Sequence, residues 1–201
     1  MAGIVEKRRK ALREKLIDIA EATITAEGLP AMRARDLAAQ AGCAVGAIYN
    51  VFGDLTDLVL AVNARTFDRL GATVSEALAE APMDPVEQLV AMSGGYHRFA
   101  TDNKNAWRAL FDVDRPAGQD APDWYLRDMA RLLAYIDAPL AVIFPQMTLE
   151  DRVLMTRALF SSVHGIVLLG LDRAGSGVPA EQIDRMIGLL LRQLTQKQSI
   201  S

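Results

Sequence analysis

RARDLAAQAGCAVGAIYNVF, residues 33–52, contains two short helical patterns joined by a tight turn. Apolar residues recur at helical spacing on both sides of Gly42, first Leu37, Ala38 and Ala41, then Val45, Ile48, Tyr49 and Phe52. Gly42 stands where a helix ends in a left-handed residue, a conformation that glycine adopts without steric cost. Small residues around the turn allow a close, steep crossing of the two helices: Ala38, Ala41, Ala44 and Gly46. The stretch is therefore predicted to be a helix-turn-helix (HTH).

The second helix of an HTH can enter the major groove of DNA. Within residues 45–52 the pattern predicts that Ile48 and Phe52 face the core. The outward positions are then Val45, Ala47, Tyr49 and Asn50. Val45 and Ala47 suit contact with thymine methyl groups, or simply a close approach to DNA. The alternative interpretation is a pair of core helices in an unrelated bundle.

The composition favours a mostly helical protein of one large or two small domains. The chain has 201 residues, of which 51% are hydrophobic and 6% aromatic, and its formal charge is −3. That total does not indicate a nucleic-acid-binding protein, but the distribution of charge differs from the total. Residues 1–15 hold six basic residues against two acidic ones, a net charge of +4: Lys7, Arg8, Arg9, Lys10, Arg13 and Lys15 against Glu6 and Glu14. A basic arm of this kind can contact phosphates, although a solvated helix start has the same pattern.

The sequence predicts a cytoplasmic protein without a membrane partner. Cys43 is the only cysteine, which excludes an internal disulfide and fits a reducing compartment; a buried filler is favoured over a thiol sensor. The N-terminal residues lack the apolar segment of a signal peptide. The longest apolar stretch, residues 158–171, is interrupted by Ser161, Ser162 and His164 and is too short to span a bilayer.

No motif indicates an enzyme, a metal site or a cofactor. The two histidines, His97 and His164, lie far apart in the sequence, and neither has a second ligand at close spacing. No serine lies in a nucleophile elbow, and no glycine-rich loop follows a strand. We therefore expect neither catalysis nor a bound metal or cofactor, and a small helical enzyme is the least favoured class.

Helical patterns continue through the rest of the chain. They predict helices over residues 7–27, 33–40, 45–52, 54–78, 84–101, 105–111, 123–136 and 148–173, and one that opens at Pro179. Asp54, Asp84 and Thr148 are predicted to cap the helices that follow them. Residues 139–145, bracketed by two prolines, are interpreted as a kinked continuation of the preceding helix.

A second group of residues, in the C-terminal part, has the character of an apolar effector cavity with a few polar groups. These candidates are Tyr96, Phe99, Trp107, Phe111, Trp124, Tyr125, Met129, His164 and Leu168. The alternative is that most of them simply form the core. Adjacent glycines, Gly94 and Gly95, interrupt a predicted helix and indicate either close helix crossing, which is favoured, or room for a ligand.

The order and spacing of one set of residues resembles the TetR-type transcriptional regulators over roughly residues 10–70. The matching positions are Gly28-Leu29, Asp36-Leu37-Ala38, Ala41-Gly42, Val45-Gly46, Ile48-Tyr49, Phe52 and Asp57-Leu58. His164-Gly165, preceded by Leu159-Phe160, is similar to the TetR subgroup with a Trp-His-Gly signature, although Val163 replaces the tryptophan.

This resemblance implies that Tyr49 and Asn50 contact phosphate oxygens, which fixes the register of the protein on DNA without reading its sequence. The chain departs from the family at four positions. The family usually has Ser or Thr near Arg33, Ala44 and Ala47, and a lysine where Leu55 stands. Such groups cap helices and donate to phosphates, so their loss weakens the expected DNA contact unless Arg33, Arg35 and the basic arm compensate.

The resulting prediction is an all-α, homodimeric DNA-binding transcriptional regulator. Residues 1–55 form a three-helix HTH domain with a basic N-terminal arm, with Lys7, Arg8, Arg9, Arg33, Arg35, Ala44, Val45, Ala47, Tyr49 and Asn50 as candidate DNA contacts. Residues 56–201 form a helical bundle that binds a small apolar or amphipathic effector and dimerises through the two C-terminal helices. The protein is expected to act as a repressor on a palindromic double-stranded DNA operator. The alternative is a helical ligand-binding or interaction protein with a degenerate HTH.

Overall fold

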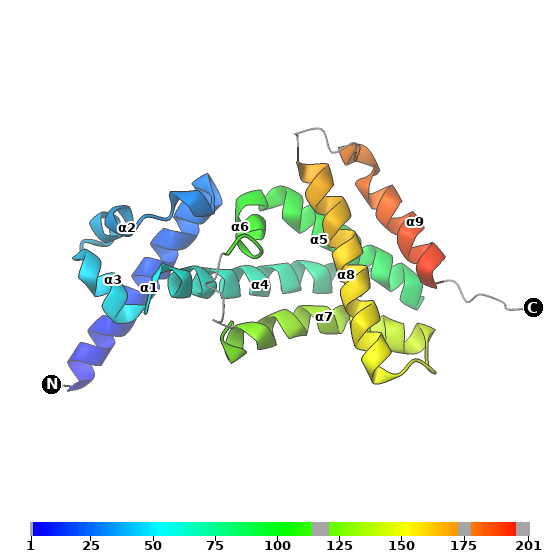
Figure 1. The fold of residues 1–201 in the computed structure, drawn as a ribbon, viewed down its shortest axis with the longest axis horizontal. Helices are drawn as coiled ribbons and strands as arrows, with labels where there is room; N and C mark the ends of the chain where they lie inside the picture. Colours follow the sequence, from blue (N-terminus) through cyan, green and yellow to red (C-terminus); the bar gives the residue numbers. More distant parts are fainter. Residues whose placement is uncertain (1, 114–120, 173–177, 196–201) are drawn as a thin grey trace, which may run out of the picture. The chain divides into compact units, whose positions relative to one another are not determined.

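A computed structural model describes residues 2–113, 121–172 and 178–195, and all regular elements among them are helical (Figure 1). The α-helices are α1 (Ala2–Glu27), α2 (Ala34–Ala41), α3 (Val45–Val51), α4 (Leu55–Ala79), α5 (Pro85–Asp102), α6 (Lys104–Ala109), α7 (Asp123–Ile143), α8 (Leu149–Leu171) and α9 (Ile183–Thr195). Two short 3₁₀ helices, η1 (Leu29–Ala31) and η2 (Ala180–Gln182), precede α2 and α9. The predicted all-α fold is confirmed.

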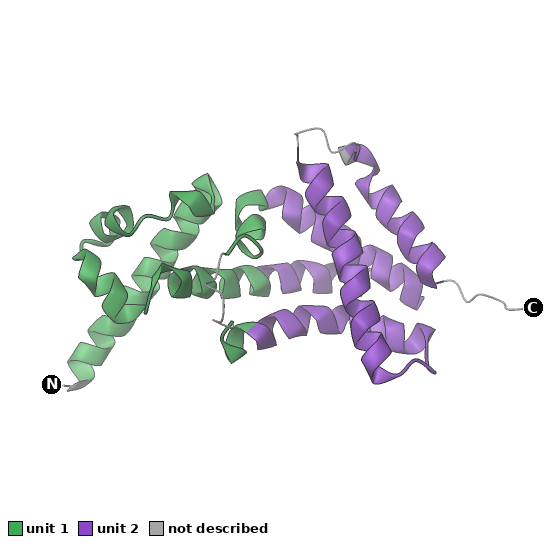
Figure 2. Ribbon diagram, in the orientation of Figure 1, with its two compact units in different colours: residues 1–68, 103–125 green, residues 69–102, 126–201 purple. Residues whose placement is uncertain are grey.

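The chain forms two compact units, coloured separately in Figure 2. Unit 1 consists of residues 1–68 and 103–125, and unit 2 of residues 69–102 and 126–201. Unit 1 therefore contains α1 to α3, the first part of α4, α6 and the first residues of α7. The later parts of α4 and α7 belong to unit 2, together with α5, α8 and α9.

The core of unit 1 holds the HTH in place. Leu16 and Ile24 of α1, Ile48 of α3 and Leu58 of α4 are fully buried in one cluster of apolar side chains, and Phe52 is 4% exposed in the same cluster. The prediction that Ile48 and Phe52 face the core is confirmed. Cys43 is half-buried against this cluster, in agreement with a small filler side chain.

A charge cluster on the surface of unit 1 joins α4 to α1. Nη1 of Arg65 donates to Asp18 at 2.7 Å and to Glu21 at 2.9 Å, and its Nη2 donates to Glu14 at 3.1 Å. These hydrogen bonds, first to Asp18 and then to Glu21, raise the pKa of the Arg65 guanidinium above its ordinary value. Because the three carboxylates follow one face of α1, one arginine fixes the rotation of that helix against α4.

Helix α6 packs against α1 and η1 within the same unit. The Asn105 side chain donates from Nδ2 to the carbonyl oxygen of Thr25 at 3.0 Å, close to the end of α1. At the other end of α6, the Asn63 side chain of α4 donates from Nδ2 to the carbonyl oxygen of Ala109 at 2.8 Å. Helix α6 is thus fastened to both α1 and α4.

In unit 2, α9 packs against α5 and α8. The guanidinium of Arg192 donates to both carboxylate oxygens of Glu87, at 2.7 and 2.8 Å, and this hydrogen bonding lowers the pKa of Glu87. The ring of His97 lies 2.8 Å from Oδ1 of Asp184. A Cβ atom at Gly95 would lie 3.0 Å from Cβ of Ala77 and 3.2 Å from the carbonyl oxygen of Thr73, so the favoured interpretation, close crossing of α5 and α4, is confirmed there.

The predicted caps are confirmed by hydrogen bonds. Oδ1 of Asp54 accepts from the backbone N–H of Asp57 at 2.7 Å. Oδ1 of Asp84 accepts from two backbone N–H groups, and Oγ1 of Thr148 accepts from that of Asp151 at 3.1 Å. These short polar side chains start α4, α5 and α8 as their sequence positions predicted.

One expectation about helix extent was wrong and one was confirmed. Helix α1 begins at Ala2, ahead of the predicted start at residue 7, so the basic N-terminal segment is helical. The helix predicted over residues 123–136 continues as α7 through Pro139 to Ile143, which agrees with the interpretation of residues 139–145 as its continuation. A proline inside a helix removes one backbone donor, and the continuation buries Leu140 completely and Ile143 to 7% exposure, which offsets that loss.

The expectation that no segment is long and apolar enough to span a bilayer was also wrong. Helix α8 meets that requirement by length and composition alone, and α3 with α4 meets it only as one pair across a bend of 63°. The serines and the histidine that interrupt the apolar stretch carry too little polarity to change this. Large apolar side chains of α8 remain exposed within the single chain, among them Leu149, Leu154 and Leu169.

The glycine between α2 and α3 provides a test of the turn. Gly42 has φ +67°, whereas Gly46 lies in α3, and a Cβ atom at either position would meet nothing within 4 Å. Only the backbone conformation differs, so we expect Gly42→Ala to lower the free energy of unfolding by about 1–2 kcal/mol. The matched Gly46→Ala change should raise it by less than about 1 kcal/mol. Urea denaturation of both variants measures this, and a neutral Gly42→Ala contradicts the left-handed turn.

A buried hydroxyl in α8 provides a second test. Thr156 is 4% exposed, and its Oγ1 has no hydrogen-bond partner among the described residues. Thr195 of α9 is equally buried, but its Oγ1 donates to the carbonyl oxygen of Leu191 at 2.6 Å. We expect Thr156→Val to stabilise the protein by about 1 kcal/mol, since it removes an unmatched polar atom, and Thr195→Val to be neutral or destabilising. Thermal melting of both variants measures these changes in stability, and equal effects of the two substitutions contradict the prediction.

Candidate functional site

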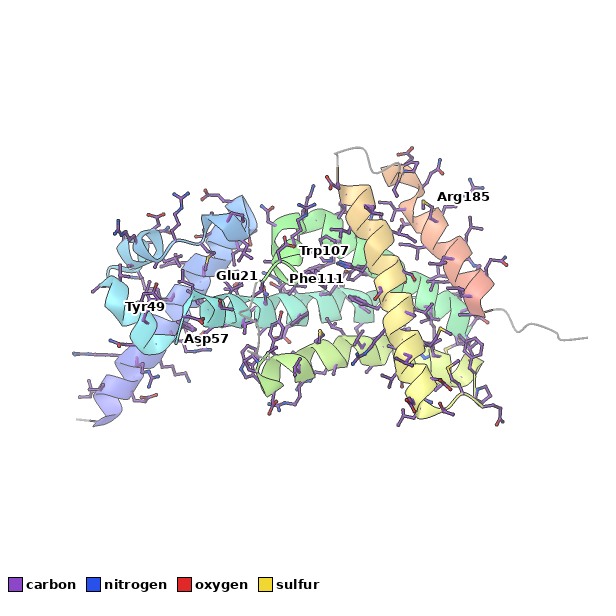
Figure 3. The ribbon with its side chains drawn as sticks, viewed as in Figure 1. Glu21, Tyr49, Asp57, Trp107, Phe111 and Arg185 are labelled. Atoms are coloured by element: carbon purple, nitrogen blue, oxygen red, sulfur yellow. The ribbon has the colours of Figure 1, made fainter. Side chains whose placement is uncertain are left out.

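The surface of α3 carries most of the predicted DNA-contacting side chains. Tyr49 is 46% exposed and Val45 36% exposed, although both are large side chains in a small domain. Ala44 and Asn50 are exposed as well, whereas Ala47 is half-buried. Tyr49 lies on α3 (Figure 3), and Ile48 next to it in the sequence is fully buried. The structure therefore gives α3 one face in the core and one face open to a partner.

The starts of α2 and α3 lack side-chain caps. Arg33 and Ala44 hold the N-cap positions with extended backbone conformations, and neither makes a side-chain cap hydrogen bond. The first N–H groups of a helix have no partner inside that helix, so they need water, a cap or a ligand. The hydroxyls missing from the sequence at Arg33 and Ala44 thus correspond to two helix starts without a side-chain cap.

The basic residues of unit 1 divide into two groups. Lys7, Arg8 and Arg9 are exposed on the first turns of α1, and Arg33 and Arg35 are exposed at the start of α2. The remaining basic residues named for the arm include two with contacts inside the unit. Nζ of Lys15 donates to the carbonyl oxygen of Ala41 at 2.8 Å, which places a cation at the C-terminal end of α2, and the Arg13 guanidinium lies 5.2 Å from the ring centre of Phe52.

The residues proposed for an effector cavity fall into both units. Unit 1 contains Trp107, Phe111, Trp124 and Tyr125. Unit 2 contains Tyr96, Phe99, Met129, His164 and Leu168. The sequence-based prediction grouped these residues by side-chain type. Side-chain type does not reveal to which compact unit a residue belongs.

The unit 1 members form two groups of aromatic contacts, one around Tyr125 and one between Trp107 and Phe111. The ring of Tyr125 lies 5.2 Å from that of Phe67 and 5.7 Å from that of Trp124, measured between ring centres. Trp107 and Phe111 lie 5.7 Å apart in an edge-on arrangement, and Figure 3 shows them close together beside α4. Trp107 is fully buried, whereas Phe111 is 41% exposed.

The sequence reasoning missed a polar residue in this region, Asn63. It is fully buried, and its Nδ2 atom lies 2.8 Å from the carbonyl oxygen of Ala109 and 3.4 Å from the hydroxyl of Tyr125. The available signal was a single amide within the apolar run Leu58–Ala64, since asparagine is a poor helix former that is rarely buried without a partner.

The unit 2 members show a different arrangement. The Tyr96 hydroxyl lies 2.7 Å from Nδ1 of His164, and the His164 ring stacks on that of Phe160 with centres 5.7 Å apart. Tyr96 and Phe99 are buried, but Met129 is 40% and Leu168 37% exposed. Tyr96 and His164 of the predicted set are thus in direct contact in unit 2, whereas Met129 and Leu168 lie at its surface.

Among the residues that the structure describes, no group of three or more His, Cys, Asp and Glu side chains is placed to hold a metal ion. The geometry on which a function can rest is therefore the exposed face of α3, the exposed basic residues of α1 and α2, and the aromatic groups of the two units.

Two family profiles match the chain. The profile for bacterial regulatory proteins of the tetR family matches residues 16–62, and the profile for the tetracyclin repressor-like C-terminal domain matches residues 89–194. The second match alone covers more than half of the chain. No curated protein sequence matches this chain significantly.

Solved structures share the whole fold. A protein of unknown function from Rhodococcus sp. RHA1 is 23% identical, with a TM-score of 0.72 over 92% of this chain and 96% of that one. A TetR transcriptional regulator from the same organism is 18% identical, with a TM-score of 0.63 over 98% of this chain and 100% of that one. RolR, solved in complex with the ligand resorcinol, is 18% identical, with a TM-score of 0.64 over 97% of this chain and 98% of that one.

The matched HTH profile covers α2 and α3, whose outer face the structure leaves open, and the matched C-terminal profile covers most of unit 2. Together they confirm the resemblance inferred from the sequence, while the Trp-His-Gly subgroup stays a prediction. Members of the family are transcription factors and not enzymes. The chain belongs to the TetR family of DNA-binding transcriptional regulators.

Proposed function

We propose that this protein is a one-component repressor that a small apolar or amphipathic effector releases from its operator. The observation that carries the proposal is the exposed face of α3, with Tyr49 46% exposed beside fully buried Ile48, in an HTH that the family profile matches. Tyr49 and Asn50 then contact phosphate oxygens, and the exposed cations Arg33, at the N-cap of α2, and Arg35, in its first turn, are proposed to do the same.

The proposed operator is a palindrome, because the protein is proposed to act as a homodimer with two-fold symmetry. The support is the apolar surface of the last two helices. Large side chains there remain exposed in the single chain: Leu149, Val153, Leu154, Leu168 and Leu169 on α8, and Leu189 and Leu194 on α9. Either a lipid bilayer or a second copy of the protein can cover such an apolar surface. We propose that a second copy does so, and that the apolar character of α8 serves dimerisation in a cytoplasmic protein.

The proposed effector is a small molecule with an aromatic or otherwise apolar body. The support is the set of aromatic side chains in both units, together with the resorcinol bound by the structural neighbour RolR. We retain residues 1–55 as the DNA-binding part and residues 56–201 as the part that binds effector and partner. Effector binding then changes operator affinity through a coupling that typically amounts to about 1–3 kcal/mol.

One observation favours a second candidate function, a helical ligand-binding protein with a degenerate HTH. Helices α2 and α3 start at Arg33 and Ala44 without side-chain caps, and Leu55 stands where the family usually has a lysine. Selection of binding sites from random duplex DNA at two salt concentrations separates the two candidates. Enrichment of a palindrome, with affinity that falls steeply as salt rises, supports the repressor. Sequence-blind binding, with and without candidate effectors, supports the alternative.

Substitutions at the exposed face test the proposed DNA contacts. We expect Tyr49→Ala to weaken operator binding by at least about tenfold, since one hydrogen bond to an anionic phosphate oxygen is lost. Arg35→Ala should weaken it similarly for all sequences and reduce the slope of log affinity against log salt by about 0.9. Arg131→Ala is the matched control, because Arg131 has a 75% exposed side chain in unit 2. Unchanged operator binding in both test variants, with the fold intact, assigns the interface to other residues.

Restoring the missing cap should have the opposite effect. We expect Ala44→Ser to raise the free energy of unfolding by about 1 kcal/mol, because a serine in this extended conformation accepts from a backbone N–H of α3. The same hydroxyl can also donate to a phosphate, so operator affinity should rise. Ala39→Ser, at an exposed position inside α2, is the control and should cost stability slightly. A stabilised Ala44→Ser variant with unchanged DNA affinity limits the role of this position to capping.

A further inference from the structure

Asn63 is a fully buried amide side chain of unit 1, and one of its two polar atoms has no hydrogen-bond partner among the described residues. It is fully buried on α4, where Nδ2 donates to the carbonyl oxygen of Ala109 at 2.8 Å and approaches the Tyr125 hydroxyl at 3.4 Å. Its Oδ1 atom has no hydrogen-bond partner among the described residues.

The orientation of this amide is fixed by its neighbours. The oxygen of Ala109 is a carbonyl and can only accept, so the amide nitrogen must face it. Turning the amide over would set two oxygens against each other at 2.8 Å. The Tyr125 hydroxyl is itself directed to another acceptor, the carbonyl oxygen of Leu110 at 3.4 Å. The Oδ1 atom therefore stays an acceptor for which unit 1 supplies no donor among its described residues.

Aromatic rings surround the partners of this amide. Tyr125, which contacts Asn63, also contacts the rings of Phe67 and Trp124, at 5.2 and 5.7 Å between ring centres. On the other side of the hydrogen bond, Trp107 and Phe111 flank Ala109 in the sequence and contact each other. Phe111 and Trp124 are 41% and 37% exposed, so rings at the surface lead to a buried polar atom.

We propose that Asn63 is an effector-recognition residue, and that its Oδ1 atom accepts a hydrogen bond from a small aromatic ligand that carries a hydroxyl or N–H donor. The inference rests on the proposed effector control and names the chemical class of the effector. A ring fits the aromatic surroundings by stacking or edge contact. A donor satisfies an acceptor that is costly to leave unmatched in a site of low polarity.

The site also has a direct link to the HTH. Ala109, the residue that Asn63 holds, belongs to the same buried cluster as Ile48 of α3 and Leu16 of α1. Helix α6, in which Ala109 is the last residue, is joined to α1 by the hydrogen bond from Asn105 to Thr25. A ligand that engages Asn63 therefore acts on the residue that anchors α6 to the core of unit 1.

The test compares phenol with toluene, two probes of nearly equal size that differ in one donor. Both tryptophans of the chain, Trp107 and Trp124, lie in unit 1, so tryptophan emission reports binding there, and calorimetry gives the affinities. We expect the full-length protein to bind phenol about tenfold more tightly than toluene, the ratio that corresponds to one net hydrogen bond to a buried group. Equal affinities, or no binding of either probe up to the solubility limit of toluene, overturn the proposal.

The variant Asn63→Leu keeps the branching at Cγ and removes the amide. We expect it to lose the preference for phenol and to bind toluene at least as well. Thr156→Val is the matched control, since it removes a second buried side-chain oxygen, in unit 2, that has no partner among the described residues, and it should keep the tenfold preference. An Asn63→Leu variant that still prefers phenol overturns the proposal.

If Asn63→Leu does not fold, wild-type crystals soaked with 4-bromophenol decide the question. A bromine signal that places the hydroxyl within hydrogen-bonding distance of Oδ1 of Asn63 supports the proposal, and a ligand seated elsewhere overturns it. Operator binding is measured separately with and without phenol. Phenol bound at Asn63 without any change in operator affinity contradicts the proposed effector control and leaves the site standing. Release from the operator by ligands that do not contact Asn63 supports the proposed effector control and contradicts the proposed role of Asn63.

Discussion

The packing of α1 against the first part of α4 is the constraint on which the HTH depends. Helices α2 and α3 are short, with eight and seven residues, and helices of that length are not stable alone. Their apolar residues are buried only because α1 and α4 supply the facing side chains, such as Leu16 and Leu58. Arg65, with its contacts to three carboxylates on α1, fixes the relative rotation of those two helices. The orientation of the exposed face of α3 thus depends on residues of α1 and α4 that are not part of that face.

Local physics made much of this architecture predictable from the sequence. A glycine in the left-handed conformation, Gly42, and the capping side chains of Asp54, Asp84 and Thr148 act over a few residues, so their effect can be read from spacing alone. The helical period likewise separated Ile48 from Tyr49, which are neighbours in the chain but opposite in burial. The candidate DNA-contacting residues follow from the same period, and their roles stay predictions.

Contacts between distant segments were not predictable in this way. The partners of Arg65 lie 44 to 51 residues before it, and those of Asn63 lie 46 and 62 residues after it. No periodic pattern connects such positions. Aromatic character alone grouped Trp107 with Tyr96, although the fold assigns them to different compact units. Asn63 was overlooked because a single polar residue in an apolar helix becomes informative only when its hydrogen bonds are known.

The uncapped starts of α2 and α3 have a consequence for control by an effector. An effector can weaken operator binding only by the coupling free energy between the two sites, about 1–3 kcal/mol in typical cases. A regulator with very tight operator binding stays bound after such a change, whereas one of moderate affinity is released. We expect the absence of hydroxyl donors at Arg33 and Ala44 to lower operator affinity, while the core around Ile48 is intact. Weaker phosphate contacts of this kind are compatible with the proposed switch, because they would bring operator binding into the range that a small ligand can overcome.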